Sequence, residues 1–151
     1  MSIECSPMPA NKPQKSEKAD PMMSTMVVGP GWRPEGYDYK TLDEFFPYYM
    51  REHSNRTCRR LHFVGTTIGM LLFLSAVLSV VWAALTKQPL GPAFGQALVL
   101  VLAAHVVGYA AAWTGHFFFE HNKPATFKYP LLSYRGDYRM WWRILTGKIA
   151  F

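Results

Sequence analysis

Residues 61–86 read LHFVGTTIGMLLFLSAVLSVVWAALT and residues 88–119 read QPLGPAFGQALVLVLAAHVVGYAAAWTGHFFF, and neither stretch contains a charged residue. A helix of about 20 apolar residues crosses a hydrocarbon core of roughly 30 Å, and both stretches are longer than that. A core helix of a soluble protein would show a polar face, which both stretches lack. The sequence therefore predicts two transmembrane helices, at about 61–85 and 93–119.

The two predicted spans share a short connection and carry a histidine at each outer end. Residues 86–92 read TKQPLGP, and their prolines and glycine are typical of a tight turn. His62 and His116 lie equally far from Pro89 along the chain, so equal helical rise returns both to the same depth. We therefore expect an antiparallel hairpin whose histidines meet at one membrane face.

Small residues on both spans indicate that the helices approach closely. Gly65 and Gly69 form a small-xxx-small pattern on the first span, and Gly108 and Gly115 lie beside a polar stripe on the second. Such patterns support packing and say nothing of chemistry.

Basic residues predict the orientation of the hairpin. Of the 16 lysines and arginines, only Lys87 falls in the connection. The positive-inside rule then places both termini in the cytosol. The net charge of +6 indicates contact with anionic membrane lipid rather than with nucleic acid, because the charges flank the spans and form no separate basic domain.

The remaining segments predict a tail and two flanking helices. Residues 1–36 are rich in proline and lack apolar periodicity, which is typical of a disordered tail, and residues 37–151 form one membrane domain. Thr41 caps a helix from Leu42 to about Glu52, and residues 137–145 form a second amphipathic helix lying in the interface. The predicted fold is an all-α membrane protein: an antiparallel transmembrane helical hairpin, flanking interfacial amphipathic helices and a disordered N-terminal tail.

Histidines near the cytosolic face suggest a metal site. Neutral imidazole binds iron or zinc well, and a catalytic metal needs about three protein ligands with open positions. His62 and His116 supply two, and a turn at Asn55 could fold His53 back beside them. Glu120, one turn after His116, is a candidate fourth ligand or an acceptor that orients an imidazole.

Two other histidines have simpler explanations. His121 points about 100° away from Glu120 on a helix and is interpreted as an interfacial polar residue. His105 lies about 16 Å deeper than His116 at helical rise, too far to share an ion. A bond from His105 to Tyr109 or to a helix carbonyl is favoured over contact with a substrate.

Basic residues near the predicted site have two interpretations. Arg56, Arg60 and Lys123 belong to a cluster at the cytosolic ends of the spans. Each is interpreted first as an anchor for lipid phosphate, and alternatively as a clamp for the carboxylate of a membrane-dissolved acid.

Three blocks of sequence carry a family resemblance. Residues 43–53 read DEFFPYYMREH, residues 60–66 read RLHFVGT, and residues 115–125 contain GHFFFE and NKPA. In this order they resemble the small Mpo1-like membrane proteins, over about residues 39–145. The yeast-type member that gives the family its name is an iron-dependent 2-hydroxy fatty acid dioxygenase of the endoplasmic reticulum.

The resemblance implies an activity and its cofactor. It implies Fe(2+), O₂ and a long-chain 2-hydroxy fatty acid that is shortened by one carbon, as in lipid α-oxidation. Carried over position by position, the family's histidines fall on His53, His62 and His116. The membrane would be the endoplasmic reticulum in a eukaryote and the inner membrane in a bacterium.

Other classes fit the sequence less well. Di-iron membrane hydroxylases need about eight clustered histidines, and the chain has five scattered ones. A zinc hydrolase could use the same ligands, but the sequence lacks a nucleophile elbow and an HExxH helix. The alternative kept open is a non-enzymatic hairpin protein that shapes membrane or binds a partner.

Overall fold

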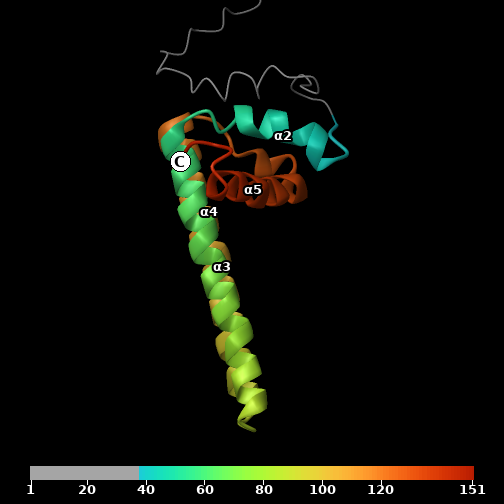
Figure 1. Ribbon diagram of the computed structural model, residues 1–151, viewed down its shortest axis with the longest axis vertical. Coiled ribbons are helices and arrows are strands. Elements are labelled where there is room, and N and C mark those ends of the chain that lie inside the picture. The colour runs from blue at the N-terminus through green and yellow to red at the C-terminus, as the bar shows by residue number, and fades with distance from the viewer. Residues whose placement is uncertain (1–37) are drawn as a thin grey trace, which may run out of the picture.

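The computed structural model describes residues 38–151, and the predicted tail lies outside them. The described part is all-helical (Figure 1). Its elements are α2 (Leu42–Arg51), α3 (Arg56–Leu85), α4 (Leu90–Gly115), the π-helix η1 (His116–Glu120), the 3₁₀-helix η2 (Ala125–Phe127) and α5 (Pro130–Leu145). Helices α3 and α4 form one long rod, and α2 and α5 lie beside one end of it.

Helices α3 and α4 pack as an antiparallel hairpin through their small residues. A Cβ atom on Gly65 would lie 2.6 Å from the Cβ atom of Ala111, and one on Gly69 would lie 3.3 Å from the carbonyl oxygen of Ala104. Positions rising along α3 therefore meet positions falling along α4, which confirms the antiparallel hairpin. Because glycine has no side chain, the two backbones can come this close.

The surface of the hairpin fits a lipid environment. Arg56–Leu85 and Leu90–Glu120 are both long and apolar enough to cross a membrane, and only 11% of each apolar window is buried within the protein. Large apolar side chains such as Leu71, Trp82 and Leu98 are exposed on it. Helices of a soluble core would hide these groups, so both helices are long, apolar and exposed enough to cross a membrane.

Both long helices begin earlier than the sequence predicted. The side-chain oxygen of Asn55 accepts hydrogen bonds from the backbone N–H groups of Thr57 and Cys58, so α3 begins at Arg56 rather than near residue 61. Helix α4 begins at Leu90 rather than near residue 93. Pro92 is tolerated there because the first turn of a helix has no internal acceptor for its N–H groups.

Helices α2 and α5 form a second layer over one end of the hairpin. Phe45, Tyr49 and Met50 of α2 are buried against Met140 and Ile144 of α5. The Trp141 indole N–H donates to the Thr67 hydroxyl at 2.8 Å and so joins α5 to α3. The amphipathic character predicted for both segments therefore serves this contact.

Helix α2 matches its predicted bounds closely, whereas α5 begins earlier than predicted. Thr41 caps α2 by accepting from the N–H of Glu44, as predicted, and the helix ends within one residue of the expected position. Helix α5 begins at Pro130, seven residues before the predicted start at residue 137. Pro130 occupies the first turn, where its fixed φ favours a helix start.

We expect Gly65→Ala to destabilise the hairpin by about 1–3 kcal/mol, because the added methyl group would overlap Ala111. Gly95→Ala is the matched control, since a Cβ atom there meets nothing within 4 Å and alanine favours helix by up to about 1 kcal/mol. Thermal unfolding in detergent, followed by circular dichroism, measures both. Equal stability of the two variants would contradict the close contact.

Candidate metal centre

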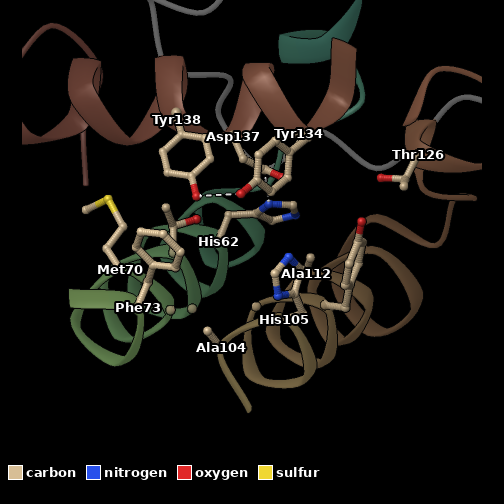
Figure 2. A pocket seen from close by; sticks show the side chains of 15 residues that line it. His62, Met70, Phe73, Ala104, His105, Ala112, Thr126, Tyr134, Asp137 and Tyr138 are labelled. Atoms are coloured by element: carbon tan, nitrogen blue, oxygen red, sulfur yellow. Dashed lines mark hydrogen bonds and ion pairs between the residues drawn. The ribbon is translucent and has the colours of Figure 1, made fainter. Parts of the chain in front are cut away.

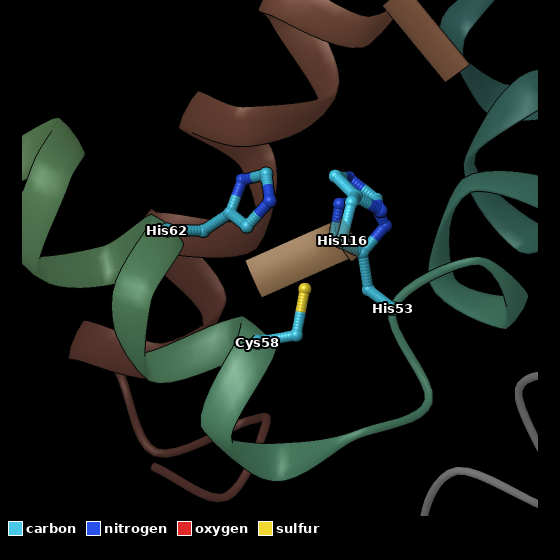
Figure 3. Close-up of side chains that lie close together, drawn as sticks. All are labelled: His53, Cys58, His62 and His116. Atoms are coloured by element: carbon cyan, nitrogen blue, oxygen red, sulfur yellow. The ribbon is translucent and has the colours of Figure 1, made fainter. Parts of the chain in front are cut away.

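Three histidines from separate segments meet at the end of the hairpin covered by α2 and α5. The ring centroids of His53 and His62 lie 4.5 Å apart, those of His53 and His116 lie 4.6 Å apart, and those of His62 and His116 lie 5.2 Å apart. All three side chains are buried. Figure 3 shows them facing one another, with Cys58 beside them. The predicted meeting of His62 and His116 at one end of the hairpin is confirmed.

Each histidine is held by a different local structure. His53 lies in the short turn between α2 and α3, and its ring stacks on Tyr49 with centroids 4.0 Å apart. His62 lies two turns into α3. His116 begins η1, a π-helical turn of the kind often found at functional sites. The turn at His53 is shorter than predicted, because α3 already begins at Arg56.

Every one of these imidazoles has its Nδ1 atom bonded to an acceptor. The Nδ1 of His53 lies 2.6 Å from the carbonyl oxygen of Tyr49, and that of His62 lies 2.6 Å from Oδ1 of Asp137. The Nδ1 of His116 lies 2.8 Å from Oδ1 of Asn122. Since these oxygens accept, each Nδ1 is the donor, and in the neutral form of such a ring the Nε2 atom keeps its lone pair for another partner.

The free nitrogens are what a metal ion would require. The Nε2 atoms of His53 and His62 are buried without a hydrogen-bond partner. Burial, reinforced by His62 and His116, holds the pKa of His53 well below its usual range, so its ring is neutral. Buried polar atoms without partners are costly and rare, which favours a ligand at this point. The bonded Nδ1 atoms match the outer contacts that orient metal-ligating histidines.

Cys58 is a further donor that the sequence did not single out. One ligand atom from each of His53, Cys58, His62 and His116 lies within 4.8 Å of the others. Metal–ligand bonds of about 2.0–2.3 Å allow two ligand atoms of one ion to lie up to about 4–4.6 Å apart, so small side-chain movements suffice. The group therefore offers three imidazoles and one thiol. With the thiol left unbound, a metal would keep open positions for a substrate.

Asp137 and Asn122 position two of the imidazoles, a role that the sequence analysis assigned to neither residue. Asp137 accepts from both the Tyr49 hydroxyl and His62. The side-chain amide of Asn122 donates to the carbonyl oxygen of Glu52 at 3.0 Å, which turns its own oxygen toward His116. The contact of Asp137 joins residues 75 apart in the sequence, and that of Asn122 depends on the turn after η1, so no local pattern predicted either one.

Tyr49 and Gly136 explain how Asp137 reaches the centre. A Cβ atom on Gly136 would lie 3.0 Å from the Tyr49 ring, so glycine lets the ring lie against α5. Burial and the neighbouring Asp137 carboxylate raise the pKa of Tyr49 well above its usual value. Tyr49 therefore remains a protonated donor to that carboxylate.

Glu120 lies outside the group of possible ligands. Its carboxylate accepts from the Ser54 hydroxyl at 3.0 Å and from the Asn55 N–H at 2.6 Å. It does not orient an imidazole in this structure. Its observed contacts instead fix the turn that carries His53.

The predicted substrate clamps lie at the surface of the protein. The side chains of Arg56, Arg60 and Lys123 are exposed, and Arg60 donates to the carbonyl oxygen of Phe151 at 3.3 Å. The buried cation is Arg59, whose guanidinium donates to the carbonyl oxygens of His53 and Ser54. These bonds hold the turn, so Arg59 stabilises the position of His53.

The two remaining histidines have local roles. The Nδ1 of His105 lies 2.8 Å from the carbonyl oxygen of Val101, which confirms the predicted bond to a helix carbonyl. His121 is exposed and ends η1 in a left-handed conformation with φ of 54°. Neither belongs to the group of possible ligands.

Two hollows adjoin the centre. A small cavity of about 10 Å³ is lined by all three histidines, and a groove of about 470 Å³ runs along the hairpin from His62. The two share four lining residues: His62, Ala112, Thr126 and Asp137. Figure 2 shows the groove, with α5 across its upper end. A ligand in the groove would therefore touch the centre.

The fold and the site together define a class: a helical hairpin able to cross a membrane, with a buried histidine cluster that could hold a metal ion at one end. The chain belongs to the Mpo1-like family, described as 2-hydroxy-palmitic acid dioxygenase Mpo1-like, and the match covers residues 39–149. The resemblance seen in the sequence is thereby confirmed. No curated protein and no solved structure gives a significant match to the chain.

We expect Asp137→Asn to weaken metal binding about tenfold and Asp137→Ala to weaken it up to about a hundredfold, because His62 loses the carboxylate that orients it. Titration of the purified protein with Co(II), followed by its visible absorption, measures the affinity. Asp38→Asn, an exposed carboxylate at the edge of the described chain, is the control. Unchanged Co(II) affinity in both Asp137 variants would contradict this orienting role.

Proposed function

We propose that this chain is an Fe(II)-dependent dioxygenase that shortens long-chain 2-hydroxy fatty acids by one carbon. The observation that carries the proposal is the set of three buried imidazoles whose Nδ1 atoms are all bonded to acceptors and whose closest ring nitrogens lie within 4.8 Å of one another. Membership in a family described as 2-hydroxy-palmitic acid dioxygenase gives the reaction its chemical class.

His53, His62 and His116 are the proposed iron ligands. Imidazole suits iron, and three protein ligands leave room for a chelating substrate and for O₂. When bound, ferrous iron supplies the electrons that make O₂ reactive toward a coordinated substrate. Cys58 is close enough to join this set, and whether its thiol binds the metal decides how many coordination positions stay open. Glu120 is left out of the proposed set because its oxygens are bonded to Ser54 and Asn55.

The proposed reaction balances with O₂ as the only co-substrate. A 2-hydroxy acid R–CH(OH)–COOH and O₂ give R–COOH, CO₂ and water. The bond between C1 and C2 breaks, C2 is oxidised to the new carboxyl carbon, C1 leaves as CO₂, and O₂ is reduced. No organic cofactor is needed.

The protein's own residues prepare the site for this chemistry. Asp137 and Asn122 keep the rings of His62 and His116 oriented, and the carbonyl oxygen of Tyr49 does so for His53. Burial of all three rings limits access of water to the reacting atoms. The two layers of the fold thus supply a dry and preorganised centre.

The proposed location is the membrane, with both termini and the metal centre on the cytosolic side. Its support is the distribution of basic residues, of which only Lys87 lies in the connection between the two long helices. In a eukaryote the membrane would be the endoplasmic reticulum, and in a bacterium the inner membrane. Such a protein would meet fatty acids dissolved in the bilayer.

Anaerobic loading with Fe(II), followed by oxygen-electrode measurement with 2-hydroxypalmitate, tests the proposal. We expect about one iron per chain, consumption of O₂, and release of pentadecanoate and CO₂ detected by mass spectrometry. Palmitate, which lacks the 2-hydroxyl group, should not be consumed. His62→Ala and His116→Ala should lose both iron and turnover, because each removes a ligand.

His121→Ala is the matched control, since this exposed histidine lies outside the cluster and its variant should keep iron and activity. Absence of both bound iron and turnover in the unaltered protein would contradict the enzyme proposal. That result would favour a non-enzymatic hairpin that shapes membrane or binds a partner.

A further inference from the structure

The groove along the hairpin has a polar end and an apolar end. At the metal centre it is lined by His62 and Asp137, with the hydroxyl groups of Tyr134 and Tyr138 lying 3.0 Å from each other. Farther along α3 and α4 its walls are mainly apolar, and Phe73 lies at the far end, about 16 Å along α3 from His62. His105 also lines this part of the groove, and its Nδ1 lies 2.8 Å from the carbonyl oxygen of Val101. A ligand with a polar head at the centre and a mainly apolar remainder therefore fits these walls.

Glycine residues make the groove. Gly65, Gly69 and Gly108 all line it. A Cβ atom on Gly108 would meet nothing within 4 Å, so this position faces open space rather than the opposite helix. A side chain placed there would fill the groove without displacing the backbone. Gly108 lies about 12 Å along the helix from His116.

The far part of the groove is accessible from the side of the hairpin that would face lipid. Phe73 is 55% exposed and Tyr109 is 39% exposed. Both line the groove and lie within the helices long enough to cross a membrane. A molecule dissolved in the bilayer could thus enter sideways, without first passing into water.

The volume of the groove decides between kinds of lipid. None of its lining residues is a lysine or an arginine, so the head of any anionic lipid would rely on the proposed metal for a positive partner. A volume of about 470 Å³ lies in the lower part of the range of sites that hold one small ligand. These properties favour a single-chain acid, whose head reaches the centre, over a two-chain phospholipid.

We propose that this groove binds the alkyl chain of the substrate acid with its methyl end toward Phe73, and that the space over Gly108 sets the longest chain accepted. The inference rests on the proposed function for the identity of the acid head. It adds the direction of the chain, the route of entry from the bilayer and the residues that determine chain length.

A series of 2-hydroxy acids, from 2-hydroxylaurate to 2-hydroxystearate, tests the chain-length part. Gly108→Leu should lower kcat/KM for 2-hydroxypalmitate at least about tenfold relative to 2-hydroxylaurate, because its side chain occupies the path of the longer tail. Phe73→Ala should shift the preference toward longer acids. Gly95→Leu and Leu74→Ala are the matched controls, since both positions are exposed and lie outside the groove.

Photo-crosslinking tests the location without relying on catalysis. Chelator-treated full-length protein in phosphatidylcholine nanodiscs is mixed with 2-hydroxypalmitate that carries a diazirine near its methyl end. Peptide mass spectrometry should place the adduct at Met70, Phe73 or their neighbours across the groove. Excess 2-hydroxypalmitate should compete, and Gly108→Leu should lower the yield severalfold, unlike Gly95→Leu.

The two experiments separate failure of this inference from failure of the proposed function. Turnover with an unchanged chain-length profile in Gly108→Leu, or adducts confined to exposed lipid-facing residues, would overturn the groove assignment and leave the dioxygenase proposal intact. Competed crosslinks in the groove without O₂ consumption would support the groove and count against the dioxygenase. Phosphatidylcholine that carries a diazirine is the competing ligand. If it crosslinks to the groove and the free acid does not displace it, the choice of a single-chain acid is overturned.

Discussion

The close antiparallel contact between α3 and α4 is the constraint on which the rest of the structure depends. It fixes the relative depth of the two helices, and so brings His62 and His116 to 5.2 Å between ring centroids. The contact exists because glycine occupies the crossing points: a Cβ atom on Gly115 would lie 2.8 Å from the Cys58 sulfur, and one on Gly65 would meet Ala111. The same close helices leave a groove where a Cβ atom on Gly108 would meet nothing within 4 Å.

A buried polar centre at the end of an apolar hairpin needs acceptors for its N–H groups, and the second layer provides them. Helix α2 supplies the carbonyl oxygen of Tyr49, α5 supplies Asp137, and the loop after η1 supplies Asn122. Packing of α2 on α5 therefore does more than cover one end of the hairpin. Together with Asn122, it provides the acceptor for each Nδ1 atom and so favours a free Nε2 atom, which a metal ion requires.

Much of the site could be predicted from residues that repeat or mirror one another along the chain. The symmetry of His62 and His116 about Pro89 was sufficient to place them together, because helical rise converts sequence distance into depth. His53 could be placed only by assuming a turn. The contacts of Cys58, Asp137 and Arg59 were not predicted, since they depend on how separate segments meet. The roles of Arg56 and Arg60 stay predictions: both side chains are exposed, and charge near a site does not tell what a side chain binds.

The sequence by itself determined two long uncharged helices, their hairpin and the family, because length, hydropathy and motif order are properties of the chain alone. Tertiary structure decided where α3, α4 and α5 begin, which oxygens hold the histidines, and that Glu120 fixes a turn. It also decided that a groove leads from His62 along the hairpin. The physical reason is that these hydrogen bonds and this groove form between segments distant in sequence. No local sequence pattern determines how such segments pack against each other.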